Sequence, residues 1–184
     1  QFQNDKGGVR CQKNYQNISL KDLMALQKSG QLKDNNFFHL SFDDGLKECA
    51  SIIAPILKER NLDATFFINP NFVGNRAIFY RYKVALLIEK LPNRKKELLQ
   101  LTIHDETKIN ELIVKHEINL CNLDIYMNLD EIVQLKNDGF SIGAHSMNHP
   151  FYADIPFDQQ LLETNESLTW VEKCLNLDYR TFSF

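Results

Sequence analysis

Two short groups of acidic and histidine residues in this chain of 184 residues have types and spacings suited to metal chemistry. The first group is Asp43-Asp44-Gly45, which directly follows an aromatic-rich run. Two adjacent carboxylates repel each other unless a cation or strong hydrogen-bond donors lie nearby. Taken alone, the group also fits an ordinary turn that leads into a helix, and Gly45 suits that interpretation.

The second group is His145-Ser146-Met147-Asn148-His149-Pro150, with two histidines four residues apart. Histidines at this spacing can share one metal ion when they lie on one helical turn or in a tight loop. Pro150 disfavours a helical conformation of the preceding His149, so we predict a tight loop with His149 extended. The alternative is that two of the five histidines have this spacing by chance.

Considered together, the two groups indicate a catalytic metal site. One carboxylate and two imidazoles leave a coordination position open for water, which is typical of catalytic zinc. The second carboxylate then remains free to act as a base. Each group follows a predicted strand, and the catalytic residues of parallel α/β barrels gather at the carboxyl ends of the strands.

The elements that must position these groups alternate between helices and strands. Strands are predicted where short apolar runs precede turn residues, at 37–42, 64–68, 140–144 and 180–184. Helices are predicted from capping residues and hydrophobic spacing at 19–30, 51–60 (with Ser51 as the N-cap), 128–139 and around 161–175. Strands separated by helices predict an α/β fold with a mainly parallel sheet. Four strands are too few to close a barrel, but they fit one side of it.

Residues 75–127 interrupt this alternation. Apolar residues near helical spacing predict helices there, and no convincing strand separates them. We interpret this segment as a helical insertion between two α/β units.

The composition limits the other classes of function. With 43% hydrophobic residues the chain can build a substantial core. A formal net charge of −3 and the lack of a dense basic stripe argue against a nucleic-acid partner. No apolar run approaches the roughly 18 residues that a membrane-spanning helix needs. The four cysteines have no CxxC pair, which argues against a structural zinc knuckle or a thioredoxin-like motif: Cys11, Cys49, Cys121 and Cys174. Their even number allows two disulfides, but Cys49 and Cys174 lie in stretches predicted to be helical, which favours reduced thiols.

Both chemical groups resemble motifs of the polysaccharide deacetylase family, whose domain is also called the NodB-homology domain. Leu40-Ser41-Phe42-Asp43-Asp44-Gly45 is similar to the family's first motif, Thr-Phe-Asp-Asp-Gly, with Ser41 in place of Thr. His145-Ser146-x-x-His149-Pro150 is similar to the second motif. The resemblance implies part of a distorted (β/α) barrel and a hydrolase that removes N- or O-acetyl groups from a carbohydrate.

The resemblance also implies a role for each site residue. Asp44, His145 and His149 would bind a divalent metal, with zinc as the expected ion. Asp43 would be the general base that takes a proton from the attacking water. Ser146 would brace the metal loop through hydrogen bonds rather than bind the ion. The partner would be an acetylated carbohydrate.

Towards its carboxyl end the chain departs from the family pattern. The third motif places an arginine against the base carboxylate, and two alignments are open. Either Arg180 is that arginine, or Phe182-Ser183-Phe184 matches the motif with Ser183 in the arginine position. The later motifs, which supply the general acid, do not occur before Phe184. The resemblance therefore implies a single partial domain over 1–184, with its C-terminal part absent, that is by itself a weak catalyst.

Several properties stay open at this stage. The insertion makes the chain between the two motifs longer than is usual in the family. Its aromatic residues Phe79, Tyr80 and Tyr82 form either its own small core or a lid or sugar platform.

The chain begins with Gln1 rather than Met, which indicates a missing natural start, and either the cytoplasm or the bacterial cell envelope fits. The sequence specifies neither the sugar nor the oligomeric state. Rival functions are a degenerate domain that binds glycan or metal, and an amidase with a non-carbohydrate substrate.

Overall fold

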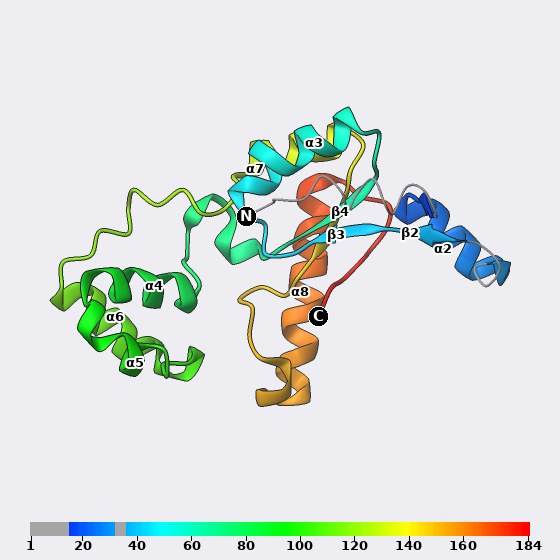
Figure 1. Ribbon diagram of the computed structural model, residues 1–184. Coiled ribbons are helices and arrows are strands. Elements are labelled where there is room, and N and C mark those ends of the chain that lie inside the picture. The colour runs from blue at the N-terminus through cyan, green and yellow to red at the C-terminus, as the bar shows by residue number, and fades with distance from the viewer. Residues whose placement is uncertain (1–14, 32–35) are drawn as a thin grey trace.

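A parallel sheet forms the centre of the computed structural model, which describes residues 15–31 and 36–184 (Figure 1). Its strands are β3 (Leu40–Phe42), β4 (Ala64–Ile68) and β5 (Ser141–Ala144), in that order. An isolated parallel bridge joins Phe182 to Ala144, so the C-terminal segment lies beside β5. The strand predicted at 180–184 is limited to this bridge.

The first predicted strand is divided at His39. β2 (Phe37–Phe38) pairs with β1 (Gln16–Asn17) in a second parallel sheet, while β3 continues to β4. The His39 ring lies between the sheets, with Nδ1 2.7 Å from the carbonyl oxygen of Ile18 and Nε2 2.8 Å from Thr65 Oγ1. A carbonyl oxygen can only accept, so Nδ1 carries the proton. His39 is therefore a satisfied structural histidine.

Two helices begin where their capping residues predict. The hydroxyl of Ser19 accepts a hydrogen bond from the backbone N–H of Asp22 and caps α2 (Leu20–Ser29), which ends at Gly30 with φ +73°. Asn128 and Glu131 form a reciprocal capping box at the start of α7 (Leu129–Asn137), with both bonds 2.9 Å long. Such caps satisfy N–H groups that the helix itself leaves unpaired.

The second predicted helix begins earlier than its expected N-cap. A π-helical turn, η2 (Cys49–Ile53), precedes α3 (Ala54–Glu59). The hydroxyl of Ser51 donates to the carbonyl oxygen of Lys47, 3.1 Å away. The N-cap prediction for Ser51 is wrong because its side chain bonds back to the preceding turn instead of capping the next one.

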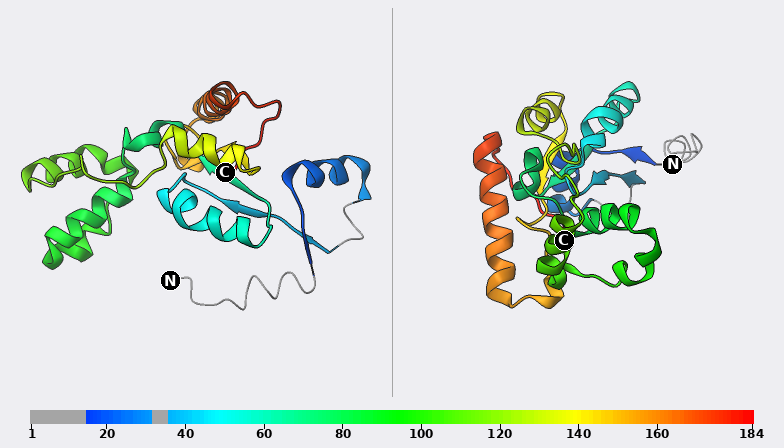
Figure 2. Two further views of the ribbon diagram at one scale, coloured as in Figure 1. Left: turned by 90° about the horizontal axis from the view of Figure 1, so that it is seen from above. Right: turned by 90° about the vertical axis from the view of Figure 1, so that its left-hand side faces the viewer.

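Three helices cover the sheet. α3 and α7 lie side by side along one side of the strands, and α8 (Phe157–Leu175) packs against β5 on another (Figures 1 and 2). All five residues of β4 are buried, as expected for a parallel strand whose two faces are covered. The core includes Phe66, Ile68, Ile132, Leu135, Ile142, Val171 and Leu175.

Residues 75–127 are helical and form a separate cluster to one side of the sheet (Figure 1). Within this fully described segment, the only β pairing is one antiparallel bridge between Tyr126 and Leu46. The Nζ atom of the buried Lys83 donates hydrogen bonds to Glu106 Oε1 at 2.8 Å and to Asn110 Oδ1 at 2.9 Å. The helices are α4 (Tyr80–Lys90), α5 (Lys95–Leu98) and α6 (Glu106–Lys115). Short 3-10 turns lie at Pro70–Asn75, Pro92–Arg94, Ile103–Asp105 and Tyr152–Asp154. The predicted helical character is confirmed.

This architecture confirms the predicted fold class. Parallel strands joined by helices form open sheets that correspond to part of a distorted (β/α) barrel. Within the described part of the chain, Cys49, Cys121 and Cys174 are free thiols, whereas Cys11 lies outside it. None of the described helices combines the length and apolar character that crossing a membrane requires.

A substitution at Gly143 tests the packing of the C-terminal segment against β5. A Cβ at this position would overlap the ring of Phe67 and the methyl group of Thr181. We expect Gly143→Ala to lower the free energy of unfolding by about 1–3 kcal/mol, because the core must shift to admit a methyl group. Urea unfolding followed by circular dichroism measures the change. Adding Phe67→Leu should recover part of the loss, and a Gly143→Ala variant as stable as wild type would contradict this packing.

Candidate metal centre

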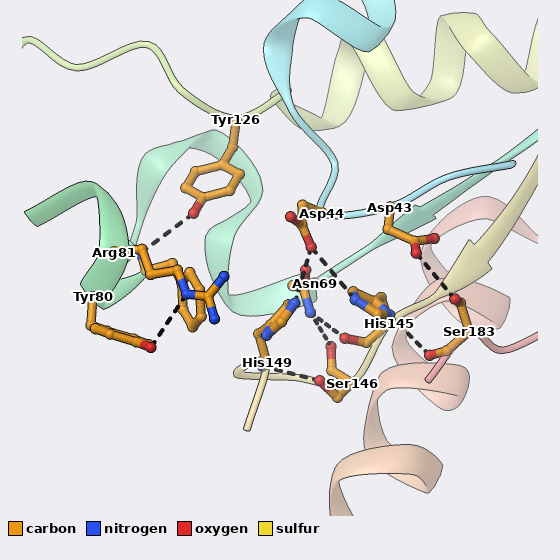
Figure 3. A network of polar contacts seen from close by, with 11 residues as sticks. Asp43, Asp44, Asn69, Tyr80, Arg81, Tyr126, His145, Ser146, His149 and Ser183 are labelled. Carbon is orange, nitrogen blue, oxygen red and sulfur yellow. Dashed lines mark hydrogen bonds and ion pairs between the residues drawn. The ribbon is translucent and has the colours of Figure 1, made fainter. Parts of the chain in front are cut away.

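The candidate site residues follow neighbouring strands at one edge of the sheet. Asp43 and Asp44 follow β3, Asn69 follows β4, and His145 follows β5. Ser183 follows the bridge that joins the C-terminal segment to β5. Because parallel strands have their carboxyl ends at the same edge, these side chains converge (Figure 3).

Asp44, His145 and His149 lie together, with one ligand atom from each within 4.8 Å of the others. His149 Nε2 lies 3.2 Å and His145 Nε2 3.5 Å from Asp44 Oδ1. This oxygen is buried, yet neither contact has the geometry of a hydrogen bond. Two imidazole nitrogens and an orphaned carboxylate oxygen gathered around one point fit a divalent cation.

The main chain of Ser183 holds His145 in the tautomer that a metal ligand requires. His145 Nδ1 lies 2.9 Å from the carbonyl oxygen of Ser183. This oxygen can only accept, so Nδ1 carries the proton. In the neutral ring Nε2 then has a free lone pair, and this atom faces Asp44.

Three residues of the site have a left-handed backbone: φ is 70° at Asp44, 62° at Ser146 and 55° at His149. Each such residue other than glycine costs about 1 kcal/mol or more and persists only where its surroundings hold it. The predicted tight loop at 145–149 is confirmed. The predicted extended conformation of His149 is wrong, because contacts around the loop outweigh the local preference that Pro150 imposes.

Asp43-Asp44-Gly45 forms a turn, and the same turn positions Asp44 as a candidate metal ligand. The interpretation as a turn and the interpretation as part of a metal site are therefore compatible. Gly45 has φ +65°, and a Cβ there would lie 3.1 Å from Ile68 Cγ2. Its carbonyl oxygen accepts from the backbone N–H of Met127 at 2.9 Å. The turn is therefore tied to the segment before α7, and that attachment fixes the position of Asp44.

Hydrogen bonds to the Ser146 hydroxyl and from the Asn69 amide hold the histidine loop. Ser146 Oγ accepts from the backbone N–H of His149 at 3.0 Å, so the hydroxyl braces the loop. The side-chain amide of Asn69 donates to the carbonyl oxygens of His145 and Ser146. Asn69 belongs to neither of the two sequence motifs, and its place directly after a buried strand is the one local signal that points to it.

Asp43 is bonded to Ser183 and not to Arg180. Ser183 Oγ donates to Asp43 Oδ2 at 3.3 Å. The guanidinium of Arg180 instead pairs with Glu172 on α8, and none of the described contacts joins it to Asp43. The expectation that Arg180 holds the base carboxylate is therefore not met. This geometry favours the alignment that puts Ser183 in the arginine position.

The helical segment reaches the site through its first residues. The ring centroids of Phe79 and His149 are 4.6 Å apart, and the Phe79 backbone N–H donates to the hydroxyl of Tyr126. Tyr80 is buried in the segment's own core and Tyr82 packs against Tyr126, so both belong to the packing of the segment, and Phe79 is the one of the three that contacts a site histidine. Arg81 lies over the Tyr80 ring, 5.9 Å from its centroid, on the side of the site where His149 lies (Figure 3).

Asp44 and His149 shift each other's pKa. Contact with His149 is the main cause that lowers the pKa of Asp44 below 3.8; the charges of His145 and Arg81 add to it and burial opposes it. Contact with Asp44 raises the pKa of His149 above 6.5, against burial and Arg81. In the absence of metal, the Asp44–His149 contact therefore makes its full contribution to stability between pH 3.8 and pH 6.5, the ordinary pKa values of the two groups. Its contribution is lost as pH rises through the raised pKa of His149 or falls through the lowered pKa of Asp44.

Comparison with known proteins places the chain in a family. Residues 31–184 match the family model for polysaccharide deacetylase, so the chain belongs to the polysaccharide deacetylase family. The resemblance of its two motifs to this family is thereby confirmed. No curated protein matches the sequence.

Three solved structures share the fold. They are the Streptococcus pyogenes deacetylase PplD in complex with acetate (16% identity, TM-score 0.62, 95% of this chain and 57% of that chain covered), IcaB from Ammonifex degensii (14%, 0.59, 93% and 59%), and the BpsB deacetylase domain from Bordetella bronchiseptica (13%, 0.57, 95% and 64%). The chain thus spans about three fifths of the length of these structures.

Metal binding at this site should weaken as pH falls through the pKa of His149, which lies above 6.5. A proton and a cation compete for the same Nε2 lone pair, so affinity should drop by at least about tenfold for each pH unit below that pKa. Zinc titrations against a chromophoric chelator between about pH 6 and pH 8 measure this. His104→Ala, at an exposed histidine outside the triad, should leave the profile unchanged. An affinity that does not vary with pH would contradict a histidine ligand with this pKa.

Proposed function

We propose that the protein containing this chain is a divalent-metal-dependent hydrolase that removes N- or O-acetyl groups from a carbohydrate. The observation that carries the proposal is the convergence of Asp44, His145 and His149, with Asp43 beside them, in a member of the polysaccharide deacetylase family. The acetate in the PplD structure is the product that such a reaction releases, which supports the same chemistry here. We also propose that 1–184 is a partial domain with a helical insertion at about 75–127.

Asp44, His145 and His149 would hold the ion. One carboxylate and two imidazoles suit zinc best, and cobalt, nickel or iron also accept these ligands. A bound divalent cation would supply Lewis acidity, which polarises the acetyl carbonyl group and makes water more acidic. The hydrogen bond from His145 Nδ1 to the carbonyl oxygen of Ser183 keeps Nε2 available and increases its basicity as a ligand.

Asp43 is the proposed general base. Its carboxylate turns towards Ser183, away from the point that the three ligand atoms share (Figure 3). The side chain belongs to an exposed residue, so water can reach it. The Ser183 hydroxyl orients Oδ2, which leaves Oδ1 free to take a proton from the attacking water. By the family resemblance, the proton donor for the leaving amine or alcohol belongs to a later motif, so the proposed activity is assigned to a protein that includes that motif.

One observation favours a second candidate, a domain that binds metal or glycan without turnover. Asp43 is bonded to a neutral hydroxyl, and among the described residues no cation pairs with it. An adjacent arginine favours the ionised form of a carboxylate more strongly than one neutral donor does. Acetate release separates the two candidates.

The decisive experiment measures acetate released by the longer protein from N-acetylated and O-acetylated oligosaccharides. We expect release with the metal-loaded protein, its loss after chelation, and its recovery when zinc or cobalt is added. His149→Ala should abolish it, whereas His104→Ala should not. Metal binding without acetate release from any substrate would favour the binding domain. Release from a non-carbohydrate acetamide alone would favour an amidase.

Asp43→Asn tests the proposed base separately from the ligands. Asparagine has almost the same shape, so the variant should bind metal as wild type does. Without a base, we expect acetate release to fall by about 10²–10⁴-fold. Asp130→Asn, at an exposed carboxylate on α7, is the matched control and should keep the full rate. An unchanged rate in Asp43→Asn excludes the assigned role.

A further inference from the structure

Glu163 is a buried carboxylate on α8 that faces the loop between the two histidines of the candidate site; its residue is 5% exposed. Oε2 accepts from the backbone N–H groups of Met147 at 2.8 Å and Asn148 at 3.0 Å. Oε1 accepts from Asn148 Nδ2 at 2.8 Å. All three bonds go to residues between His145 and His149, and no cation of the described chain pairs with this carboxylate.

The network around Glu163 requires a group that only accepts. Asn71 Nδ2 donates to Asn148 Oδ1 at 2.6 Å, which directs Asn148 Nδ2 towards Glu163. Every group that meets the carboxylate is therefore a donor, and an ionised carboxylate is the acceptor that matches them all. A glutamine at 163 would set its own NH₂ group against one of these donors unless the side chains of Asn71 and Asn148 both reversed. A buried charge without a cation is costly, and these three hydrogen bonds compensate for it.

The loop that Glu163 contacts needs such support. Ser146 and His149 both have positive φ, a conformation that persists only when neighbouring groups hold it. From the β4 side, the Asn69 side chain binds the carbonyl oxygen of Ser146 at 3.2 Å, and the Asn71 N–H binds that of Met147 at 3.3 Å. From the α8 side, Glu163 alone among the described residues binds the backbone N–H groups in the middle of the loop.

We propose that Glu163 is a positioning residue of the metal centre. By holding the backbone of Met147 and Asn148, it fixes the turn that brings His149 Nε2 to Asp44 and His145. The inference rests on the proposed function, because the role is defined by metal binding. Glu163 is not a ligand and acts through the position of His149.

The test compares Glu163→Gln with Glu166→Gln. Glu166 is exposed on the same helix, and none of the hydrogen bonds described above joins it to the loop, so its variant loses the same charge without removing a bond to Met147 or Asn148. Zinc affinity is measured by competition with a chelator, and the geometry of the site by the absorption spectrum of bound Co²⁺. Hydrogen exchange of the Met147 and Asn148 amides in the metal-free protein reports the contact itself.

In Glu163→Gln we expect zinc affinity to fall about 10–100-fold, the range typical when a partner that orients metal ligands is lost. The Co²⁺ spectrum should change, and both amides should exchange faster. Glu166→Gln should match wild type in all three measurements. If Glu163→Gln does not fold, Asn148→Ala serves instead: it removes one of the three bonds and should give faster exchange with a smaller loss of affinity.

A folded Glu163→Gln with wild-type zinc affinity would overturn the proposal, even if its melting temperature fell, because the residue would then serve stability alone. Unchanged exchange of the two amides would overturn it as well. A wild-type chain that binds no zinc would remove the metal centre of the proposed function, and the role of Glu163 with it. Zinc binding by wild type and an unaffected variant would overturn the role of Glu163 alone.

Discussion

Backbone hydrogen bonds between parallel strands fix the backbone positions from which the side chains of the candidate site extend. The N–H of His145 donates to the carbonyl oxygen of Ile68 at 2.9 Å, and the N–H of Ser183 donates to that of Ala144 at 3.0 Å. These bonds continue the pairing past the last strand residue. The side chains that follow neighbouring strands are therefore held at one edge of the sheet, and a shift in pairing would separate them all.

The histidine loop is not stable through its local sequence alone. Its left-handed residues are unfavourable, and Asn69 and Glu163 compensate from two different elements by binding its carbonyl and N–H groups. Buried hydrogen bonds of this kind favour one conformation of the loop. An ion that binds here therefore meets ligands already in place and does not have to order the loop.

Ser183 connects the proposed base to the proposed ligands. Its hydroxyl bonds Asp43, and its carbonyl oxygen bonds His145. The carbonyl contact is made by the main chain, so any residue at this position would keep it. The side chain at this position determines the charge of the group that contacts the Asp43 carboxylate. Here that group is a neutral hydroxyl donor, whereas the family pattern places a charged arginine there. The two functions of this position are therefore physically separate.

The sequence by itself determined the elements whose signals are local. Capping at Ser19 and Asn128, the buried strand before Asn69, and each of the two motifs that supply the candidate ligands depend on residues close together in the chain. Spacing and residue type are sufficient for such features because the interactions involved span only a few residues.

Only the tertiary structure decided the contacts between distant segments. Arg180 and Ser183 were both compatible with the family pattern, and the bridge from Phe182 to Ala144 placed the serine beside Asp43. The extended conformation expected of His149 gave way to contacts with other elements. Asn69 and Glu163 lie 76 and 16 residues from their first partners in the loop. No local pattern specifies such contacts, because they form only when the strands and α8 have packed.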